Sequence, residues 1–448
     1  MLSHARDLLE AHFGYPEFRP LQTRVVRHVL AHRDVLAVLP TGGGKSLCFQ
    51  VPALMADAPT IVVSPLIALM QDQVGRLRAH GVAATMLGGD LARGAVADTL
   101  DAMATGTLRL VYVSPERLTS LAHHMAARGI EVARIAVDEA HCVVEWGHDF
   151  RPAYQRIGDA RRVLGDPPIT ALTGTATPEV RDEIRRSLRF AHRAPSVVGS
   201  FDRPNLRFHV VRVQSEPERL AKLVTRVRAS REPAIVYAPT RNLVEGLSHA
   251  LRGVGIVAAP YHAGLQPHER RQTLDGFLGD RIRVVVATSA FGMGIDKPDI
   301  TLVAHWTPPP SPEAYYQEAG RAGRDGRVSE CVLYSHPRDS AMPHRQLGVT
   351  FPDERIVEAV WREPALRQRH PAGVVASIDR LAEELRPDRG RVDWTRVRRR
   401  RREAERRIEA MVRYAAARRC RRAILLEWFG ERPRRCTGCD RCGSRRVS

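Results

Sequence analysis

The fold of this chain is decided by the stretch Val35-Leu36-Ala37-Val38-Leu39-Pro40-Thr41-Gly42-Gly43-Gly44-Lys45-Ser46. Its apolar first half predicts a buried strand, and a helix-like stretch, residues 47–55, follows the glycine turn. Strand, glycine turn, Lys-Ser and helix in this order are typical of a P-loop, whose backbone N–H groups surround phosphates. The strict pattern has glycine where this chain has Leu39, so the match is partial. A glycine-rich turn with an incidental lysine is the alternative.

The lysine of this stretch is unusual for the chain. Lys45 is one of three lysines, against 66 arginines. A compact ammonium reaches between the β- and γ-phosphates of a nucleotide, where a planar guanidinium fits poorly. We therefore predict that Lys45 binds ATP phosphates, that residues 41–44 (Thr41, Gly42, Gly43 and Gly44) cradle them, and that Ser46 binds Mg²⁺.

A second apolar run, residues 133–137, ends in Asp138-Glu139-Ala140-His141. A strand-end carboxylate such as Asp138 can hold Mg²⁺, and its neighbour Glu139 can orient or deprotonate an attacking water. An Asp-Glu pair by itself is usually a solvated turn. Downstream of a P-loop, at the end of a later strand, the pair predicts half of a metal-dependent ATPase site.

Strand-like and helix-like runs alternate twice along the chain, over residues 33–189 and again over 233–335. Such alternation predicts two α/β domains with parallel sheets, joined near residues 200–204. The second domain has no P-loop, but it carries the turn Gly320-Arg321-Ala322-Gly323-Arg324-Asp325-Gly326. Its arginines can stabilise charge on a transferred phosphoryl group, and a solvated basic turn is the alternative.

The charge of the chain points to a polyanionic partner. The formal net charge is +19, and the last 63 of the 448 residues hold 22 arginines against 8 acidic residues. The sequence shows no apolar signal-peptide core and no run near the roughly 20 apolar residues of a membrane span. We expect a cytoplasmic protein with no membrane partner.

Seven cysteines in a reducing compartment do not indicate a disulfide framework. Three are scattered and are predicted to be ordinary buried thiols. Three others follow one another at two-residue gaps, and a fourth precedes them by sixteen positions: Cys420, Cys436, Cys439 and Cys442. Four such ligands predict a tetrahedral structural zinc site, and an iron–sulfur cluster is the alternative.

From about Leu8 to Cys442 the chain resembles the RecQ family of superfamily-two DNA helicases. The segments that carry the resemblance are residues 13–15 with 18–22, 64–73, 138–142, 146–152, 171–176, 261–265, 290–298, 315–326, 420–422 and the cysteine cluster. The resemblance implies that Tyr15 stacks on the adenine of ATP and that Gln22 bonds its edge, in an element that also contains Arg19. It further implies that Arg324 is the arginine finger and Arg321 its supporting partner.

Residues 146–152 resemble the aromatic-rich loop of the family, which contacts single-stranded DNA and signals to the ATP site. In this chain the loop offers Trp146, His148, Phe150 and Arg151 for stacking and for phosphate contact. Val144-Glu145 stands where the family usually has Ser-Gln, and Gly174 replaces a more usual alanine.

The resemblance implies two tandem RecA-like domains, residues 1–200 and 201–340, followed by a helical, zinc-binding C-terminal region. We expect a basic helical insert at 341–410, for which a winged-helix-like module is one interpretation, and a four-cysteine region at 411–448. The run Arg398 to Arg402 in the insert has two interpretations, phosphate contact or a solvated helix face. The resemblance also implies a short form without the winged-helix and HRDC modules of many relatives.

The implied activity is ATP-dependent translocation, 3′ to 5′ on single-stranded DNA, with unwinding of forked or tailed duplexes in repair or recombination. The expected cofactors are ATP, Mg²⁺ and Zn²⁺, and we expect a monomer. An RNA helicase, or a nucleic-acid-stimulated ATPase without robust unwinding, is the alternative within the enzyme class. A nucleic-acid clamp whose ATP site only switches conformation is the alternative from another class.

Overall fold

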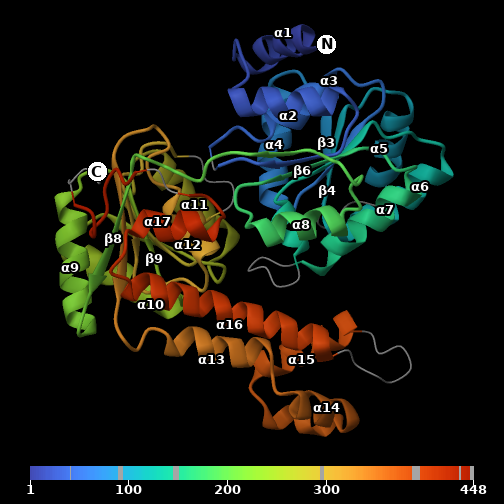
Figure 1. Cartoon of the computed structure of the whole chain (residues 1–448). Helices are drawn as coiled ribbons and strands as arrows, with labels where there is room; N and C mark the ends of the chain where they lie inside the picture. The colour runs from blue at the N-terminus through green and yellow to red at the C-terminus, as the bar shows by residue number, and fades with distance from the viewer. Residues whose placement is uncertain are drawn as a thin grey trace. The chain divides into compact units, whose positions relative to one another are not determined.

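The structure is a computed structural model that describes residues 1–40, 42–88, 94–144, 151–292, 297–385, 394–432 and 435–443 (Figure 1). The chain forms two compact units, each described here by itself. The first contains Met1–Phe201 and the short segment Phe429–Glu431. The second contains Asp202–Gly292, Lys297–Trp428 and the described residues after Glu431.

The first unit is built on a seven-stranded parallel sheet with the strand order β3-β4-β2-β5-β6-β1-β7. Its strands are β1 (Val35–Val38), β2 (Thr60–Val63), β3 (Ala84–Leu87), β4 (Leu110–Val113), β5 (Arg134–Val137), β6 (Ile169–Thr173) and β7 (Ser196–Val198). The central strands are buried along their whole length, as expected when helices cover both faces of a parallel sheet. Because all strands run parallel, the carboxyl ends of β1, β5 and β6 meet at one edge.

Two helices of the first unit precede β1, and the others connect the strands. The helices are α1 (Leu2–Phe13), α2 (Pro20–Leu30), α3 (Leu47–Leu54), α4 (Ile67–Ala79), α5 (Ala95–Ala104), α6 (Pro115–Ala127), α7 (Ile157–Val163) and α8 (Pro178–Ser187), with 3₁₀ turns η1 (Ala140–Val143) and η2 (Pro152–Arg156). Val25 and Val29 of α2 and Phe49 of α3 belong to the same core cluster as β1. This packing places the amino-terminal ends of α2 and α3 beside the turn that follows β1.

The second unit is built on a six-stranded parallel sheet with the order β10-β11-β9-β12-β13-β8. Its strands are β8 (Leu206–Arg212), β9 (Ala234–Tyr237), β10 (Ala258–Tyr261), β11 (Val284–Ala287), β12 (Leu302–His305) and β13 (Ser329–Ser335). The connecting helices are α9 (Glu216–Ala229), α10 (Arg241–Gly253), α11 (Pro267–Leu278) and α12 (Pro312–Ala319). The predicted fold of two parallel α/β sheets is therefore confirmed.

After β13 the chain becomes helical. The elements are α13 (Ala341–Thr350), α14 (Glu354–Arg362), η3 (Pro364–Arg369), α15 (Ala372–Leu385), α16 (Trp394–Ala416) and α17 (Arg421–Trp428), and α16 runs alongside α13 (Figure 1). The elements from α13 to α16 share a core of their own around Phe351, Val360 and Ile378. A winged-helix-like module would require a β-hairpin, and the described residues 341–385 and 394–416 contain helices and no strand.

The arginine run lies on α16 and does not form one free basic face. Arg398 makes a two-pronged ion pair with Glu354, at 2.6 Å for each oxygen. Arg400 is buried, with its guanidinium carbon 5.7 Å from the ring centre of Phe351. These two arginines bind residues within the helical module. Arg401 pairs with Glu405 at 3.2 Å, and Arg399 and Arg402 are exposed.

No helix among the described residues combines the length and the apolar composition that crossing a membrane requires.

Candidate functional site

The turn after β1 has the backbone geometry of a phosphate-binding loop. Gly42 and Gly44 have φ values of 78° and 66°, in the left-handed region that favours glycine. A Cβ on Gly43 would lie 2.7 Å from the carbonyl oxygen of Pro40, so only glycine fits there. The turn leads into α3, with Lys45 and Ser46 partly buried just before its first residue. Thr41 lies outside the described residues.

Side chains at the start of α2 hold this turn from the side. Arg19 donates from Nη1 to the carbonyl oxygen of Gly42 (2.7 Å), and Gln22 donates from Nε2 to those of Gly43 and Gly44 (3.0 Å each). The amide oxygen of Gln22 accepts from the backbone N–H of Arg19 at 2.8 Å. The amide N–H groups of Gln22 therefore donate to the P-loop, and the role of Gln22 at the adenine edge stays a prediction.

These contacts of Arg19 and Gln22 with the P-loop were not predicted from the sequence, although a signal was present. Arg19 and Gln22 stand at the N-cap and third positions of α2, the spacing of a capping box. Tyr15, which was predicted to stack on the base, lies on the surface with 55% of its area exposed. An exposed aromatic ring near a P-loop is available to a ligand, and stacking on adenine stays a prediction.

Asp138 stands at the carboxyl end of β5 in a buried position, with 6% of its area exposed. Its Oδ1 accepts from the backbone N–H of Glu139 at 3.0 Å, and Tyr154 donates its hydroxyl to the carbonyl oxygen of Asp138 at 3.0 Å. Burial, then the charge of Glu139, raises the pKa of Asp138 to about 6, while Lys45 works in the opposite direction. A buried carboxylate and a serine hydroxyl are both oxygen ligands of the kind that a hard cation takes, so Asp138 and Ser46 fit Mg²⁺ by their chemistry.

Glu139 is held in an unusual backbone conformation. Its φ is 45°, a left-handed value that is rare outside glycine and typical of functional sites. One of its carboxylate oxygens lies 3.3 Å from Nδ1 of His141, and the same ring nitrogen lies 2.9 Å from the hydroxyl oxygen of Thr173. Thr173 in turn donates to the carbonyl oxygen of Thr175 at 3.1 Å. The ends of β5 and β6 are thus joined through His141.

The candidate DNA-binding loop lies mostly outside the described residues, which resume at Arg151. Trp146, His148 and Phe150 are therefore without a structural account. The backbone N–H of Arg151 donates to the carbonyl oxygen of Cys142 at 3.0 Å. The end of the loop is thus attached to η1, the turn that contains His141.

The second unit presents its arginine-bearing turn, residues 320–326, directly after α12. Arg321 is buried, with 8% of its area exposed, and a Cβ on Gly292 would lie 3.0 Å from its Nη2. Its side chain is hydrogen-bonded to Tyr237. Burial raises the pKa of Tyr237 above its usual range, and Arg321 acts in the opposite direction. Arg324 is partly buried. The turn therefore has a defined position against the end of the sheet.

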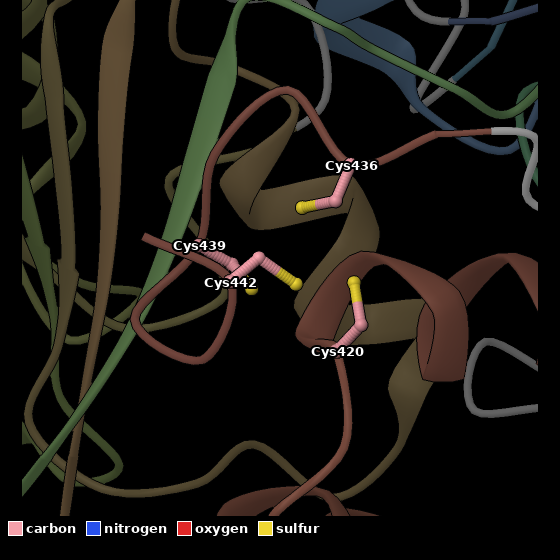
Figure 2. A group of neighbouring side chains, drawn as sticks. All are labelled: Cys420, Cys436, Cys439 and Cys442. Atoms are coloured by element: carbon pink, nitrogen blue, oxygen red, sulfur yellow. The ribbon is translucent and has the colours of Figure 1, made fainter. Parts of the chain in front are cut away.

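The four C-terminal cysteines come together, as predicted. One sulfur from each of Cys420, Cys436, Cys439 and Cys442 lies within 4.8 Å of the others, and their side chains point toward one another (Figure 2). Zn–S bonds of about 2.3 Å in a tetrahedron set sulfur atoms about 3.8 Å apart, so the cluster has the size of a zinc site. Burial acts to raise the pKa of the Cys439 thiol. Backbone hydrogen bonds from Arg421, Arg441 and Cys442 nevertheless hold this pKa below its usual range. Stabilised thiolates are the form that binds zinc.

The cysteine cluster is attached to the edge of the second sheet. Cys439 forms a parallel bridge with Phe208 of β8, and the backbone N–H of Asp440 donates to the carbonyl oxygen of Phe208 at 3.1 Å. Arg421 makes a two-pronged ion pair with Asp440, at 2.9 and 3.2 Å. Neighbours of the metal ligands therefore also bind the strand that opens the second unit.

Three family models match consecutive parts of the chain. The DEAD/DEAH box helicase model matches residues 19–184, the helicase conserved C-terminal domain matches 215–326, and the RecQ zinc-binding model matches 378–443. The first range contains the P-loop and Asp138, the second contains the arginine turn, and the third contains the four cysteines. The zinc-binding character of the cluster therefore has support from both its geometry and its family.

Known relatives are similar over most of the chain. The ATP-dependent DNA helicase RecQ of Bacillus subtilis (strain 168) is 44% identical over 341 residues, which are 76% of this chain and 57% of that protein. This chain thus spans less than two thirds of that relative. A crystal structure of the DUF1998 helicase MrfA bound to DNA has a similar fold, with a TM-score of 0.63 and 20% identity over 77% of this chain and 52% of that one.

The probable ATP-dependent DNA helicase RecS of Bacillus subtilis (strain 168) is 37% identical over 340 residues, 75% of this chain and 68% of that protein. With this relative and three consecutive family matches, the chain belongs to the RecQ family of ATP-dependent DNA helicases.

Proposed function

We propose that the chain hydrolyses ATP to move 3′ to 5′ along single-stranded DNA and to separate duplexes in DNA repair or recombination. The observation that carries the proposal is the edge of the first sheet where β1, β5 and β6 end. There the P-loop, the buried carboxylate of Asp138 and the link from Glu139 through His141 to Thr173 occur together. Direction of movement and biological role come from the family alone.

Each assigned residue has a chemical task in the proposal. Lys45 binds the phosphates of ATP, and Asp138 with Ser46 holds Mg²⁺, which when bound neutralises charge on the phosphate oxygens. Glu139 orients the attacking water and accepts its proton, and the contact with His141 fixes its carboxylate. Arg324, with Arg321 beside it, stabilises negative charge on the transferred phosphoryl group.

DNA is the proposed polyanion for a chain with a formal net charge of +19. The proposed contacts are the aromatic and basic residues of the loop that ends at Arg151, which suit stacking of unpaired bases and contact with phosphates. The cysteine cluster holds one zinc ion in a structural role, because four thiolates leave no open coordination position for chemistry.

The ATPase reaction tests the proposed site. We expect single-stranded DNA to stimulate ATP hydrolysis more than duplex DNA or RNA does. Lys45→Ala should abolish turnover because it removes the phosphate ammonium, and Glu139→Gln should keep ATP binding while losing turnover because it spares the metal ligands. Lys222→Ala, an exposed lysine on α9, is the matched control and should behave as wild type.

Near-normal DNA-stimulated turnover in Lys45→Ala or Glu139→Gln would refute the assigned site. Stronger stimulation by RNA than by single-stranded DNA would instead favour an RNA helicase on the same fold.

A further inference from the structure

One arginine outside the assigned site binds the turn that carries Arg321 and Arg324. Arg203 donates from Nη1 to the carbonyl oxygen of Gly320 at 3.2 Å, and from Nη2 to those of Ala322 and Gly323 at 3.0 and 2.7 Å. These three carbonyl groups belong to the residues that flank Arg321 and immediately precede Arg324. Arg203 itself is the second residue of the second unit.

The chemistry of an arginine suits this contact. The turn begins directly after α12, so its carbonyl groups have no intrahelical partners and lie next to the negative end of the helix dipole. A planar guanidinium offers several N–H groups in a fixed fork, so one side chain can reach three acceptors at once. A lysine ammonium at the same place is a point donor that cannot span them.

The opposite side of the turn is held by backbone groups. The N–H of Gly323 donates to the carbonyl oxygen of Ile300 at 2.8 Å, and the N–H of Asp325 donates to that of Pro298 at 3.2 Å. Arg203 binds the carbonyl side while residues 298–300 bind the amide side. The turn is thus fixed between two segments, and the positions from which Arg321 and Arg324 project depend on both.

Arg203 is in turn held by a buried arginine of α17. Arg422, with 1% of its area exposed, donates from Nη1 to Asp202 Oδ1 at 2.5 Å and to the carbonyl oxygen of Arg203 at 2.8 Å. Its Nη2 donates to the carbonyl oxygen of Leu206 at 2.5 Å. Thr437 donates to the carbonyl oxygen of Pro204 at 2.6 Å. The backbone around Arg203 is therefore fixed on both sides of the residue.

We propose that Arg203 is a positioning residue for ATP hydrolysis: it holds residues 320–326 so that Arg321 and Arg324 keep the orientation in which they act on ATP. The inference rests on the proposed ATPase function. Arg203 acts through the turn and not on the nucleotide. Its loss should therefore lower kcat while the KM for ATP and the affinity for single-stranded DNA stay near their wild-type values.

The test compares Arg203→Gln and Arg203→Lys with Arg207→Gln, a matched control that removes an exposed arginine from the same segment. We expect Arg203→Gln to lower the kcat of DNA-stimulated hydrolysis about tenfold or more, because small displacements of catalytic groups are costly. Arg203→Lys should recover only part of this loss, since it keeps the charge without the fork. Arg207→Gln should keep wild-type kcat. If Arg203→Gln does not fold, Arg203→Lys carries the same test with a smaller loss of kcat.

A double substitution separates positioning from general damage to the fold. If Arg203 acts through the turn, adding Arg203→Gln to Arg324→Gln should change kcat by less than about twofold, because the group being positioned is already absent. The inference would be overturned if the two substitutions lowered kcat by factors that multiply in the double variant. A wild-type kcat in both Arg203 variants, or a change in KM alone, would also overturn it. Wild-type chain without nucleic-acid-stimulated ATPase would instead refute the proposed function. An inactive Arg324→Gln beside fully active Arg203 variants would refute the positioning role only.

Discussion

Replacing Asp138 by asparagine is expected to stabilise the first unit at neutral pH while it abolishes ATP turnover. Burial, then the neighbouring charge of Glu139, raises the pKa of Asp138 from 3.8 to about 6. Asparagine has nearly the same shape and no charge, and its amide oxygen can still accept the hydrogen bond that the N–H of Glu139 donates at 3.0 Å. The substitution therefore removes a buried charge and keeps the acceptor for that N–H group.

The size and the sign of the effect follow from proton linkage. Because the pKa is higher in the folded chain, the folded state holds the proton more tightly than the unfolded state does, so stability falls as the pH rises between about 4 and 6. The full penalty is present above about pH 7. At 1.36 kcal/mol for each pH unit, a pKa displaced from 3.8 to about 6 corresponds to about 3 kcal/mol. The advantage of Asp138→Asn should thus grow from near zero at about pH 4 to about 3 kcal/mol above about pH 7.

Scanning calorimetry of the full chain without added Mg²⁺ measures this advantage. For a unit of this size, about 3 kcal/mol corresponds to an increase in Tm of about 6 to 12 °C. Asp7→Asn, at an exposed aspartate of α1, is the control and should leave Tm unchanged. An Asp138→Asn variant that is no more stable than wild type at about pH 8 would refute the reasoning. So would a gain of equal size at about pH 4 and about pH 8.

Three further outcomes are expected. Gln22→Glu removes both N–H donors to the P-loop carbonyls and places a carboxylate beside them. Steady-state assays should therefore show a KM for ATP raised about tenfold or more. An unchanged KM would show that these contacts of Gln22 are dispensable. Metal analysis should find one zinc per chain, and Cys439→Ser should lose it and become protease-sensitive; iron with visible absorbance, or a well-folded zinc-free chain, would contradict this. Converting Arg399 and Arg402 to Gln should lower the slope of log DNA affinity against log salt by up to roughly 0.7 per lost contact. An unchanged slope would indicate a solvated helix face. Arg400→Ala should instead lower thermal stability, because the side chain of Arg400 is buried.

How far the sequence predicted the fold depended on how each strand is buried. β1, at Val35–Val38, lies within the apolar stretch 35–39 that was predicted to be a buried strand, because a central parallel strand is apolar along its whole length. β7 and β8 were not predicted. β7 has only three residues, and β8 lies at a sheet edge, where the exposed Arg207 stands between the buried Leu206 and Phe208. Edge strands lack the continuous apolar run that marks a buried one.

The sequence placed the P-loop and the Asp138 strand end in order, yet it did not predict the side chains that hold them. The contacts of Gln22 with the P-loop, and of Arg203 with the arginine turn, join residues that are far apart in the chain. Only the packing of α2 and the path of the segment before β8 bring them together. Such contacts leave little trace in local sequence pattern.

The arginine run shows the opposite case, in which a usable signal was present. Arg400 follows Val397 by three positions and precedes Ile408 by eight, so helical periodicity places it on the apolar face of α16. Counting arginines alone gave each member of the run the same expected role. The periodicity distinguishes the buried Arg400 from its exposed neighbours.

Strand displacement on tailed duplexes tests most directly whether this chain couples ATP hydrolysis to movement along DNA. Wild-type chain should separate a duplex with a 3′ single-stranded tail in the presence of ATP and Mg²⁺, and it should leave the matching 5′-tailed duplex intact. Glu139→Gln, with its ATP binding retained, should separate neither. Displacement without ATP hydrolysis, preference for the 5′ tail, or brisk DNA-stimulated ATPase with no strand separation would contradict the proposed function.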